Sequence, residues 1–416
     1  MRLLIIADWF FPSVPGGLAR VAWDVARMMV RRGHHVEFVA AESDAVLSAP
    51  AEEVHEGVVV HRFPRPRFAA WNPRRGAVQI GLFREAVARV LPRGFDVVHY
   101  HSIFTGMGAV AAVTAGAHRP ALAYTIHSPI VAEQRLAWEQ QGWIGAVNNV
   151  VGPPVMRRME RRLLDAADVR HTLSAFVAGE LAREHPHRVL PFHIIPHWVA
   201  PTSRRTLTVK QARERLGWRS NGRTLFTVRQ LRPRYGIADA ITAVAPLARR
   251  GACDFMIAGS GPLLETLRSA IREHGAEGHV HLVGRISDHD LQLAYQAADL
   301  FLLPTRALEG FGLIILEALA YGLPVLGTGV GAIPEVLGAI LPEFLVPPAD
   351  VAALRGRVED FLTGRLRAPP ADVVAETVHR LYGERVIGDR YESFYADARR
   401  GPRERSPDLV HRPCSR

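Results

Sequence analysis

Residues 304–322 read PTRALEGFGLIILEALAYG, and the rest of the chain is interpreted outward from them. The short apolar run Leu300–Leu303 just before them is typical of a buried parallel strand. A loop with an acidic residue, Glu309, and two glycines follows, and then an apolar stretch with helical spacing. Gly322, with Pro324 just beyond, stands where a helix is expected to end. The stretch therefore predicts a strand, a loop and a helix in succession.

The start of this helix is a predicted anion-binding site. The backbone N–H groups of Phe311, Gly312 and Leu313 lie at the expected helix start, where no helix carbonyl accepts from them. One carboxylate, Glu309, precedes them and a second, Glu317, follows on the helix. A phosphate flanked by two carboxylates suggests a sugar nucleotide, whose hydroxyls would donate to the acids. For the two acids alone, the alternative is two solvated glutamates with no ligand.

The full string E-G-F-G-L-x-x-x-E-A-x-A-x-G-x-P-V, from Glu309 to Val325, is far more specific than the spacing of two acids. It resembles the donor-site signature of the family 4 retaining glycosyltransferases, which have the GT-B fold. The resemblance covers nearly the whole chain and is most specific over residues 280–335. It implies an α/β protein in which two Rossmann-like domains face each other across a central cleft.

Composition is that of a globular protein large enough for two domains. The chain has 416 residues, of which 48% are hydrophobic and 22% charged. No segment reaches the roughly 18 uninterrupted apolar residues of a membrane span, and the apolar start 1–7 is too short for a signal peptide. Cys253 and Cys414 lie far apart without metal-ligand spacing, which fits a reducing compartment. We expect a cytoplasmic protein.

The net charge of +10 indicates attraction to an anionic partner. A phosphorylated substrate or an acidic membrane at the inner face fits better than nucleic acid, because no nucleic-acid-binding motif is present. The arginine pairs 157–158 and 161–162, with Met156, Met159 and the leucines at 163–164, could form a basic amphipathic face that contacts a membrane. A solvated helix face is the competing interpretation.

The first 200 residues alternate between apolar strands and amphipathic helices, as in a parallel sheet covered on both faces. The strand at residues 3–7 and the helix at 18–32 are joined by a loop that ends in Gly16 and Gly17. In the family a similar turn faces the donor diphosphate, so the resemblance assigns both glycines to the donor site. Taken alone, a Gly-Gly turn is an ordinary loop.

Three histidines stand at expected carboxyl ends of strands, where ligands collect in open α/β sheets: His99, His101 and His127. A metal site is disfavoured because no carboxylate or cysteine joins them at ligand spacing. His127 resembles the histidine of the family's T-x-H-D string, which lies near the transferred sugar, although Ser128 replaces the aspartate. Residues 130–150 could be either a mobile acceptor-binding loop or a helical excursion.

The polar, proline-containing residues 200–206 are the expected domain linker. We place an acceptor-side Rossmann-like domain at 1–200 and a nucleotide-sugar donor-binding domain at 207–375. Residues 376–400 resemble the closing helices with which the family crosses back to its first domain, and 401–416 are expected to be disordered. In the second domain Gly259 and Arg285 are also assigned to donor binding.

Two arginines, Arg229 and Arg234, are the cations expected nearest the diphosphate, where they would neutralise the leaving group. The family pattern is G-R-L-x-x-x-K-G, whereas this chain has R-Q-L-R-P-R-Y-G at 229–236. Gln230 and Tyr235 therefore occupy the usual Arg and Lys positions, and the two arginines keep the spacing of five but are each shifted by one residue. We therefore assign the role of neutralising the leaving group to Arg229 and Arg234.

The resemblance implies transfer of a hexosyl group from a nucleoside diphosphate sugar to a hydroxyl of a glycan, lipid-linked or small-metabolite acceptor, with retention of configuration. It implies no metal and no cofactor beyond the sugar nucleotide as co-substrate. The alternatives are a sugar-nucleotide epimerase of the same fold and an inactive nucleotide-sugar-binding protein. A nicotinamide enzyme is poorly supported, because the Gly259-Ser260-Gly261 turn lacks the third glycine of the dinucleotide fingerprint.

Overall fold

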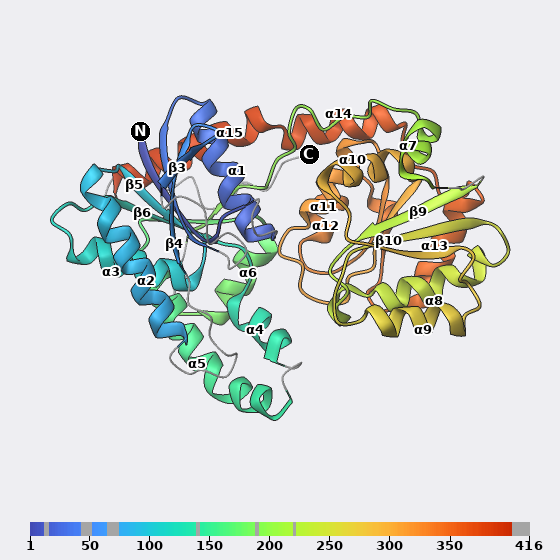
Figure 1. The fold of residues 1–416 in the computed structure, drawn as a ribbon, viewed down its shortest axis with the longest axis horizontal. Helices are drawn as coiled ribbons and strands as arrows, with labels where there is room; N and C mark the ends of the chain where they lie inside the picture. The colour runs from blue at the N-terminus through green and yellow to red at the C-terminus, as the bar shows by residue number, and fades with distance from the viewer. Residues whose placement is uncertain are drawn as a thin grey trace. The chain divides into compact units, whose positions relative to one another are not determined.

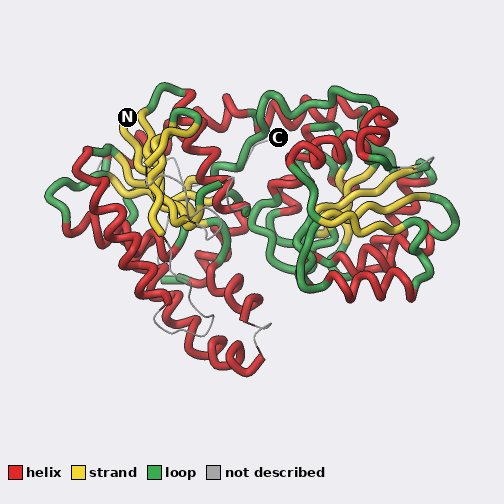
Figure 2. Tube along the Cα trace, in the orientation of Figure 1, coloured by secondary structure: helices red, strands yellow, loops and turns green. Residues whose placement is uncertain are grey.

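The computed structural model of the chain describes residues 1–11, 16–42, 52–64, 75–138, 142–187, 191–218 and 222–401. The chain divides into two compact units: Met1–His197 together with Ile387–Arg416, and Trp198–Val386. Each unit has a sheet of strands at its centre with helices on both faces (Figures 1 and 2). The predicted α/β class with two Rossmann-like sheets is confirmed.

The N-terminal unit is built on an eight-stranded sheet of order β3-β4-β2-β1-β5-β6-β7-β8, parallel except for β3 at one edge. Its strands are β1 (Arg2–Trp9), β2 (His35–Glu42), β3 (Glu52–His55), β4 (Val58–Pro64), β5 (Val97–Tyr100), β6 (Ala121–Ile126), β7 (Val169–Thr172) and β8 (His193–Ile194). Its helices are α1 (Gly17–Arg31), α2 (Arg75–Val90), α3 (Ile103–Ala115), α4 (Ile130–Trp138), α5 (Gly142–Ala166) and α6 (Ala175–Glu184). Strand order reverses between β1 and β5, so the loops after these two strands flank the position where such sheets bind ligands.

The C-terminal unit is built on a six-stranded parallel sheet of order β11-β10-β9-β12-β13-β14. Its strands are β9 (Arg223–Val228), β10 (Cys253–Ala258), β11 (Val280–Gly284), β12 (Leu300–Leu303), β13 (Val325–Thr328) and β14 (Leu345–Val346). Its helices are α7 (Val209–Leu216), α8 (Ile237–Ala248), α9 (Leu264–Glu273), α10 (Asp288–Ala297), α11 (Leu313–Ala320), α12 (Ile333–Leu337), α13 (Val351–Leu362) and α14 (Ala371–Tyr382). Here strand order reverses between β9 and β12.

The chain returns to the N-terminal unit through helix α15 (Glu384–Arg400), most of which belongs to that unit. Its Tyr395 hydroxyl lies 2.8 Å from His99 Nδ1, and His99 Nε2 lies 2.7 Å from the Thr125 hydroxyl. Thr125 in turn lies 2.7 Å from His171 Nδ1, and His171 Nε2 lies 2.8 Å from the Ile195 carbonyl. Because a carbonyl only accepts, the neutral His171 ring must donate from Nε2 and accept from Thr125 at Nδ1. Thr125 then accepts from His99 Nε2, and His99 Nδ1 accepts from the Tyr395 hydroxyl. His99 is therefore part of the anchor of α15.

Two stretches differ from the simplest sequence expectation. The described part of residues 130–150 is helical, in α4 and α5, so the mobile-loop alternative is wrong there. Helix α2 was not predicted, because the stretch before it is rich in Pro and Arg and its own apolar residues are loosely patterned. Its Phe83 and Val87 are nevertheless fully buried, so packing on the sheet rather than a strong local signal holds this helix.

Candidate functional site

Helix α11 begins one residue later than the sequence suggests. Gly312 is its N-cap, in the left-handed region at φ 85°, and Leu313 is the first helical residue. The Ile315 N–H already donates to the Gly312 carbonyl at 2.8 Å. The amides without a helix partner are therefore those of Gly312, Leu313 and Ile314, and Phe311, whose side chain is buried, lies before the helix. The predicted helix start is present with its amide donors shifted by one residue, and its role as an anion site stays a prediction.

The end of α11 follows the sequence prediction. Gly322 has a left-handed φ of 69°, and its N–H donates to the Leu319 carbonyl at 2.9 Å. The Leu323 N–H donates to the Ala318 carbonyl at 3.1 Å. This pair of bonds is a Schellman motif, which satisfies the last carbonyls and fixes the length of the helix.

Arg229 and Glu309 form an ion pair beside this helix start. The Arg229 Nη2 atom lies 2.5 Å from Glu309 Oε2, and the two side chains are only 12% and 14% exposed. Arg229 directly follows β9, and the loop after β12 carries Glu309, so both lie where the strand order of the sheet reverses. Leu308, just before Glu309, has a positive φ of 53°, which is uncommon for a bulky residue and marks a constrained loop.

Tyr235 brings the two predicted arginines together. The guanidinium carbons of Arg229 and Arg234 lie 4.8 Å and 4.7 Å from the centre of its ring, within cation–π distance. Arg234 Nη2 also donates to the Tyr235 hydroxyl at 2.7 Å. Gln230, at the family's usual arginine position, is exposed. The two arginines thus converge on Tyr235, and Arg229 reaches the Glu309 carboxylate.

Gly259 allows the basic loop, residues 229–236, to pack closely on the turn after β10. A Cβ atom at Gly259 would lie 1.8 Å from the Arg229 carbonyl oxygen, and the residue has a φ of 133°. The Arg229 N–H donates to the Ala258 carbonyl, and the Leu231 N–H to the Ser260 carbonyl, both at 3.0 Å. Gly259 therefore supports the position of Arg229, whereas Arg285, at the end of β11, is exposed.

Glu317 is held by a partner that the sequence did not indicate. The hydroxyl of Tyr295, a buried residue of α10, donates to Glu317 Oε2 at 2.7 Å. A second set of unpredicted contacts is made by Arg306, in the loop after β12. Its side chain pairs with Asp239 of α8, and its backbone N–H donates to the Arg234 carbonyl, in the loop after β9, at 2.8 Å. None of these contacts has a local sequence signal, because each joins elements that are far apart in the sequence.

In the N-terminal unit, Gly16 and Gly17 are exposed and stand at the start of α1. Gly16 has a φ of 171°, an extended conformation open to any residue, so its backbone does not require glycine. The prolines that precede it in the predicted turn lie outside the described residues.

His127 is half-buried at the end of β6, and its Nε2 lies 3.1 Å from His101 Nδ1. Burial lowers the pKa of His127 to about 3, so its imidazole is neutral at pH 7. Ser128, where the family has aspartate, donates to the carboxylate of Glu133 on α4. Glu133 of helix α4 therefore places a carboxylate next to Ser128, the position at which this chain departs from the family string.

Among the described residues, one group of histidine and acidic side chains has the spacing to hold a metal ion: Glu160, Glu184 and His185 in the N-terminal unit. None of them belongs to the predicted donor or acceptor residues. The same described residues contain no helix long and apolar enough to cross a membrane.

Comparisons with known proteins agree with this architecture. The family model described as Glycosyltransferase Family 4 matches residues 15–203, and the model described as Glycosyl transferases group 1 matches residues 208–376. A GDP-mannose-dependent α-(1-6)-phosphatidylinositol monomannoside mannosyltransferase of Mycobacterium tuberculosis is 31% identical over 225 residues, which cover 52% of this chain and 58% of that protein.

Solved structures show the same fold. Sucrose-phosphate synthase from Thermosynechococcus elongatus superposes with a TM-score of 0.79 at 20% identity, covering 95% of this chain and 98% of that one. HepE from Anabaena, in complex with UDP and glucose, superposes with a TM-score of 0.72 at 18% identity, covering 95% and 99%. The fold is GT-B, which defines the class of protein. The chain belongs to the family 4 glycosyltransferases.

Proposed function

We propose that this protein is a retaining, metal-independent hexosyltransferase that moves a hexosyl group from a nucleoside diphosphate sugar to an acceptor hydroxyl. The observation that carries the proposal is the meeting of Arg229, Glu309 and the first turn of α11 where the C-terminal sheet reverses its strand order. This position supplies cations, amide donors and a hydroxyl acceptor together, which are the groups that a sugar diphosphate needs.

In the proposed reaction the leaving diphosphate gains negative charge as the bond to the sugar breaks. Arg229, Arg234 and the amides of Gly312, Leu313 and Ile314 would stabilise that charge without a divalent cation. Glu309 would accept a hydrogen bond from a sugar hydroxyl while it fixes the orientation of Arg229. No covalent nucleophile is assigned, and the diphosphate itself would take the acceptor's proton on the same face of the sugar, so the configuration is retained.

Glu317 would bind the ribose of the donor. Its Oε2 already accepts from Tyr295, so the carboxylate is oriented before a ligand binds. The neutral imidazole of His127 would hydrogen-bond near the transferred sugar, and Glu133 stands beside Ser128 on the proposed acceptor side.

A screen of nucleotide sugars by thermal shift tests donor binding. A donor present at 100 times its dissociation constant adds about 2.7 kcal/mol to the free energy of unfolding, so the preferred base and sugar are identified together. Names of similar proteins suggest that GDP-mannose and UDP-glucose should lead the panel, since the mannosyltransferase is GDP-mannose-dependent and HepE was solved with UDP and glucose.

Two alternatives make different predictions for the released nucleotide. An epimerase would consume donor without any acceptor, and an inactive binding protein would give a thermal shift but no turnover. The uncharged Gln230 and Tyr235 at the family's usual basic positions favour the binding protein. Nucleoside diphosphate that appears only when an acceptor is added supports the transferase, whereas turnover without acceptor or binding without turnover contradicts it.

As a partner of the enzyme we propose an acidic membrane surface at the cytoplasmic face, contacted by helix α5. The apolar residues first assigned to its basic face are not available, because Met156 and Met159 pack against the core and the leucines at 163–164 are buried. Exposed apolar and basic residues nevertheless follow one another along α5: Val147, Val150, Val151, Val155, Arg158, Arg161 and Arg162. In this order the valines would insert into the apolar part of the membrane, and the arginines would contact anionic headgroups beside it.

Sedimentation with phosphatidylcholine vesicles, with and without phosphatidylglycerol, tests this contact. We expect binding only to the anionic vesicles and a loss on Arg158→Glu/Arg161→Glu/Arg162→Glu. Arg268→Glu/Arg272→Glu, which reverses two exposed charges on α9, is the control for a general loss of positive charge. An equal loss in both variants, or no binding at low salt, would exclude α5 as a specific contact.

A further inference from the structure

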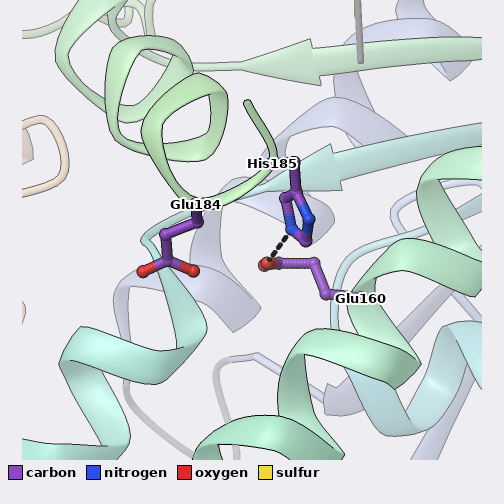
Figure 3. Close-up of side chains that lie close together, drawn as sticks. All are labelled: Glu160, Glu184 and His185. Atoms are coloured by element: carbon purple, nitrogen blue, oxygen red, sulfur yellow. Dashed lines mark hydrogen bonds and ion pairs between the residues drawn. The ribbon is translucent and has the colours of Figure 1, made fainter. Parts of the chain in front are cut away.

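Three side chains meet between α5 and α6, and none of them is assigned a part in the reaction. Glu160 lies in α5, Glu184 is the last residue of α6, and His185 follows directly. One ligand atom from each, a carboxylate oxygen or an imidazole nitrogen, lies within 4.8 Å of the other two. Figure 3 shows the Glu160 carboxylate between the His185 ring and the Glu184 carboxylate.

The cluster is buried and incompletely paired. The side chains of Glu160 and His185 are 0% and 1% exposed, and His185 Nε2 lies 2.9 Å from Glu160 Oε2. Glu160 Oε1, Glu184 Oε2 and His185 Nδ1 are buried and have no hydrogen-bond partner among the residues that the structure describes. Unpaired carboxylate oxygens in such a place are costly, and a cation that binds them offsets that cost.

A second buried carboxylate in the same unit shows what complete pairing looks like. Glu37 is 2% exposed, and its two oxygens are contacted by His35 and His61 at 3.0 and 2.6 Å and by Arg2 and Arg93 at 3.4 and 3.3 Å. Glu37 thus has two arginines against one carboxylate.

The cluster has two carboxylates against one imidazole. Arg157 acts on Glu184 through space, but no ion pair joins it to either acid. The missing positive charge is the clearest difference between the two sites, because buried carboxylates persist only when they are neutralised.

We propose that Glu160, Glu184 and His185 bind a divalent transition-metal ion, with Zn²⁺ as the best fit. The cation takes the place of the proton between His185 and Glu160, and Glu184 completes a three-residue set with water as the fourth ligand. An imidazole ligand disfavours Mg²⁺ and Ca²⁺, which prefer oxygen alone. Zinc bonds of about 2.0–2.2 Å require ligand atoms roughly 3.4 Å apart, so the half-buried Glu184 side chain must move inward on binding.

Such an ion would cross-link α5 to α6 and stabilise the N-terminal unit, since it binds the folded arrangement and not the unfolded chain. It would not take part in the transfer reaction, because none of the proposed reacting residues contacts it. Stability and metal content, rather than rate, are therefore the measurements that reveal it.

The test uses the full chain, stripped with a chelator and titrated with ZnCl₂, MnCl₂ or MgCl₂. We expect one tightly bound zinc per chain after desalting, and a melting temperature raised by about 5 °C or more at 100 times the dissociation constant. Glu184→Gln, which changes a partly exposed side chain, should remove that equivalent and the thermal shift. Glu37→Gln removes a buried carboxylate elsewhere and should keep both, which controls for the general effect of losing a buried charge.

Glu160→Gln and His185→Gln should behave as Glu184→Gln does, provided that circular dichroism shows them folded. The proposal is overturned if the wild-type chain binds no tight zinc equivalent. It is equally overturned if Glu184→Gln, folded, binds zinc as the wild type does, since the ion then lies elsewhere. Loss of the equivalent in Glu37→Gln as well would show that the loss in Glu184→Gln is not specific to the cluster, and it would also reject the site.

Discussion

The guanidinium of Arg229 lies 2.5 Å from the carboxylate of Glu309, although 80 residues separate them in the chain. The pairing of β9 with β12 brings them together, because parallel neighbours end at the same edge of the sheet. The ion pair orients Arg229 toward the start of α11. The same ion pair supports the assignment of the basic role to Arg229, whereas Gln230 is exposed, and the register of residues 229–236 stays a prediction that kinetics can test.

Removal of either arginine should lower the rate more than it weakens binding of the donor. We expect Arg229→Ala and Arg234→Ala each to reduce kcat by about 10²–10³, because a cation beside the diphosphate interacts more strongly with the transition state than with the bound donor. Steady-state kinetics with varied donor separate kcat from KM.

Gln230→Ala and Tyr235→Phe are the matched controls. Gln230 is exposed, and Phe at 235 keeps the ring that contacts both guanidinium groups while it loses one hydrogen bond. Both should cost far less than the arginine variants. A crippled Gln230→Ala beside a near-normal Arg229→Ala would show that the register is wrong, and four near-normal variants would favour the binding-protein alternative.

Glu317→Ala should weaken donor binding by about 1–3 kcal/mol, the usual scale for a lost hydrogen bond to a charged group. Calorimetric titration with the identified donor measures it. Tyr295→Phe removes the hydroxyl that holds Glu317 Oε2 but leaves the carboxylate, so it should cost less. Unchanged affinity in folded Glu317→Ala would remove this residue from the donor site.

A chelator should leave the initial rate intact, since arginines and amides do the work that a divalent cation does in other transferases. The measurement is made well below the melting temperature, because the proposed zinc between α5 and α6 would make stability, but not chemistry, sensitive to chelation. Rate loss that Mn²⁺ or Mg²⁺ restores in both the wild type and Glu184→Gln would point to a catalytic metal instead.

Stability should fall in mild acid because of the histidines beneath α15. Burial lowers the pKa of His171 to about 3, and that of His99 also lies well below its usual 6.5. A lowered histidine pKa means that the unfolded chain binds more protons between these values, so this stabilisation is complete above about pH 6.5 and is lost as pH falls toward 3.

Urea denaturation between pH 7.5 and 4.5 measures this loss. Tyr395→Phe removes one hydrogen bond to His99 and should cost about 1 kcal/mol at pH 7.5 while it leaves the pH slope largely unchanged. His171→Gln should make the slope shallower. A slope identical to wild type in folded His171→Gln would show that this histidine is not responsible.

The sequence indicated the strand, loop and helix around Glu309 because their signals are local: an apolar run, glycines, and a helix end at Gly322. The start of α11 was misplaced by one residue, since only the left-handed backbone of Gly312 shows where the helix begins. The contacts of Tyr295 with Glu317 and of Arg306 with Asp239 could not be read from the chain, because each joins elements that the fold alone brings together. The histidine anchor likewise requires the return of α15.

The anomeric configuration of the product tests the central claim most directly. The protein is incubated with the donor found in the thermal-shift screen and with an acceptor that causes nucleoside diphosphate release, and the new glycosidic linkage is examined by proton NMR. We predict an α-linked product from an α-linked donor, with one diphosphate released for each linkage formed. A β-linked product would contradict retention, and donor consumed without any new glycosidic linkage would contradict the assignment as a transferase.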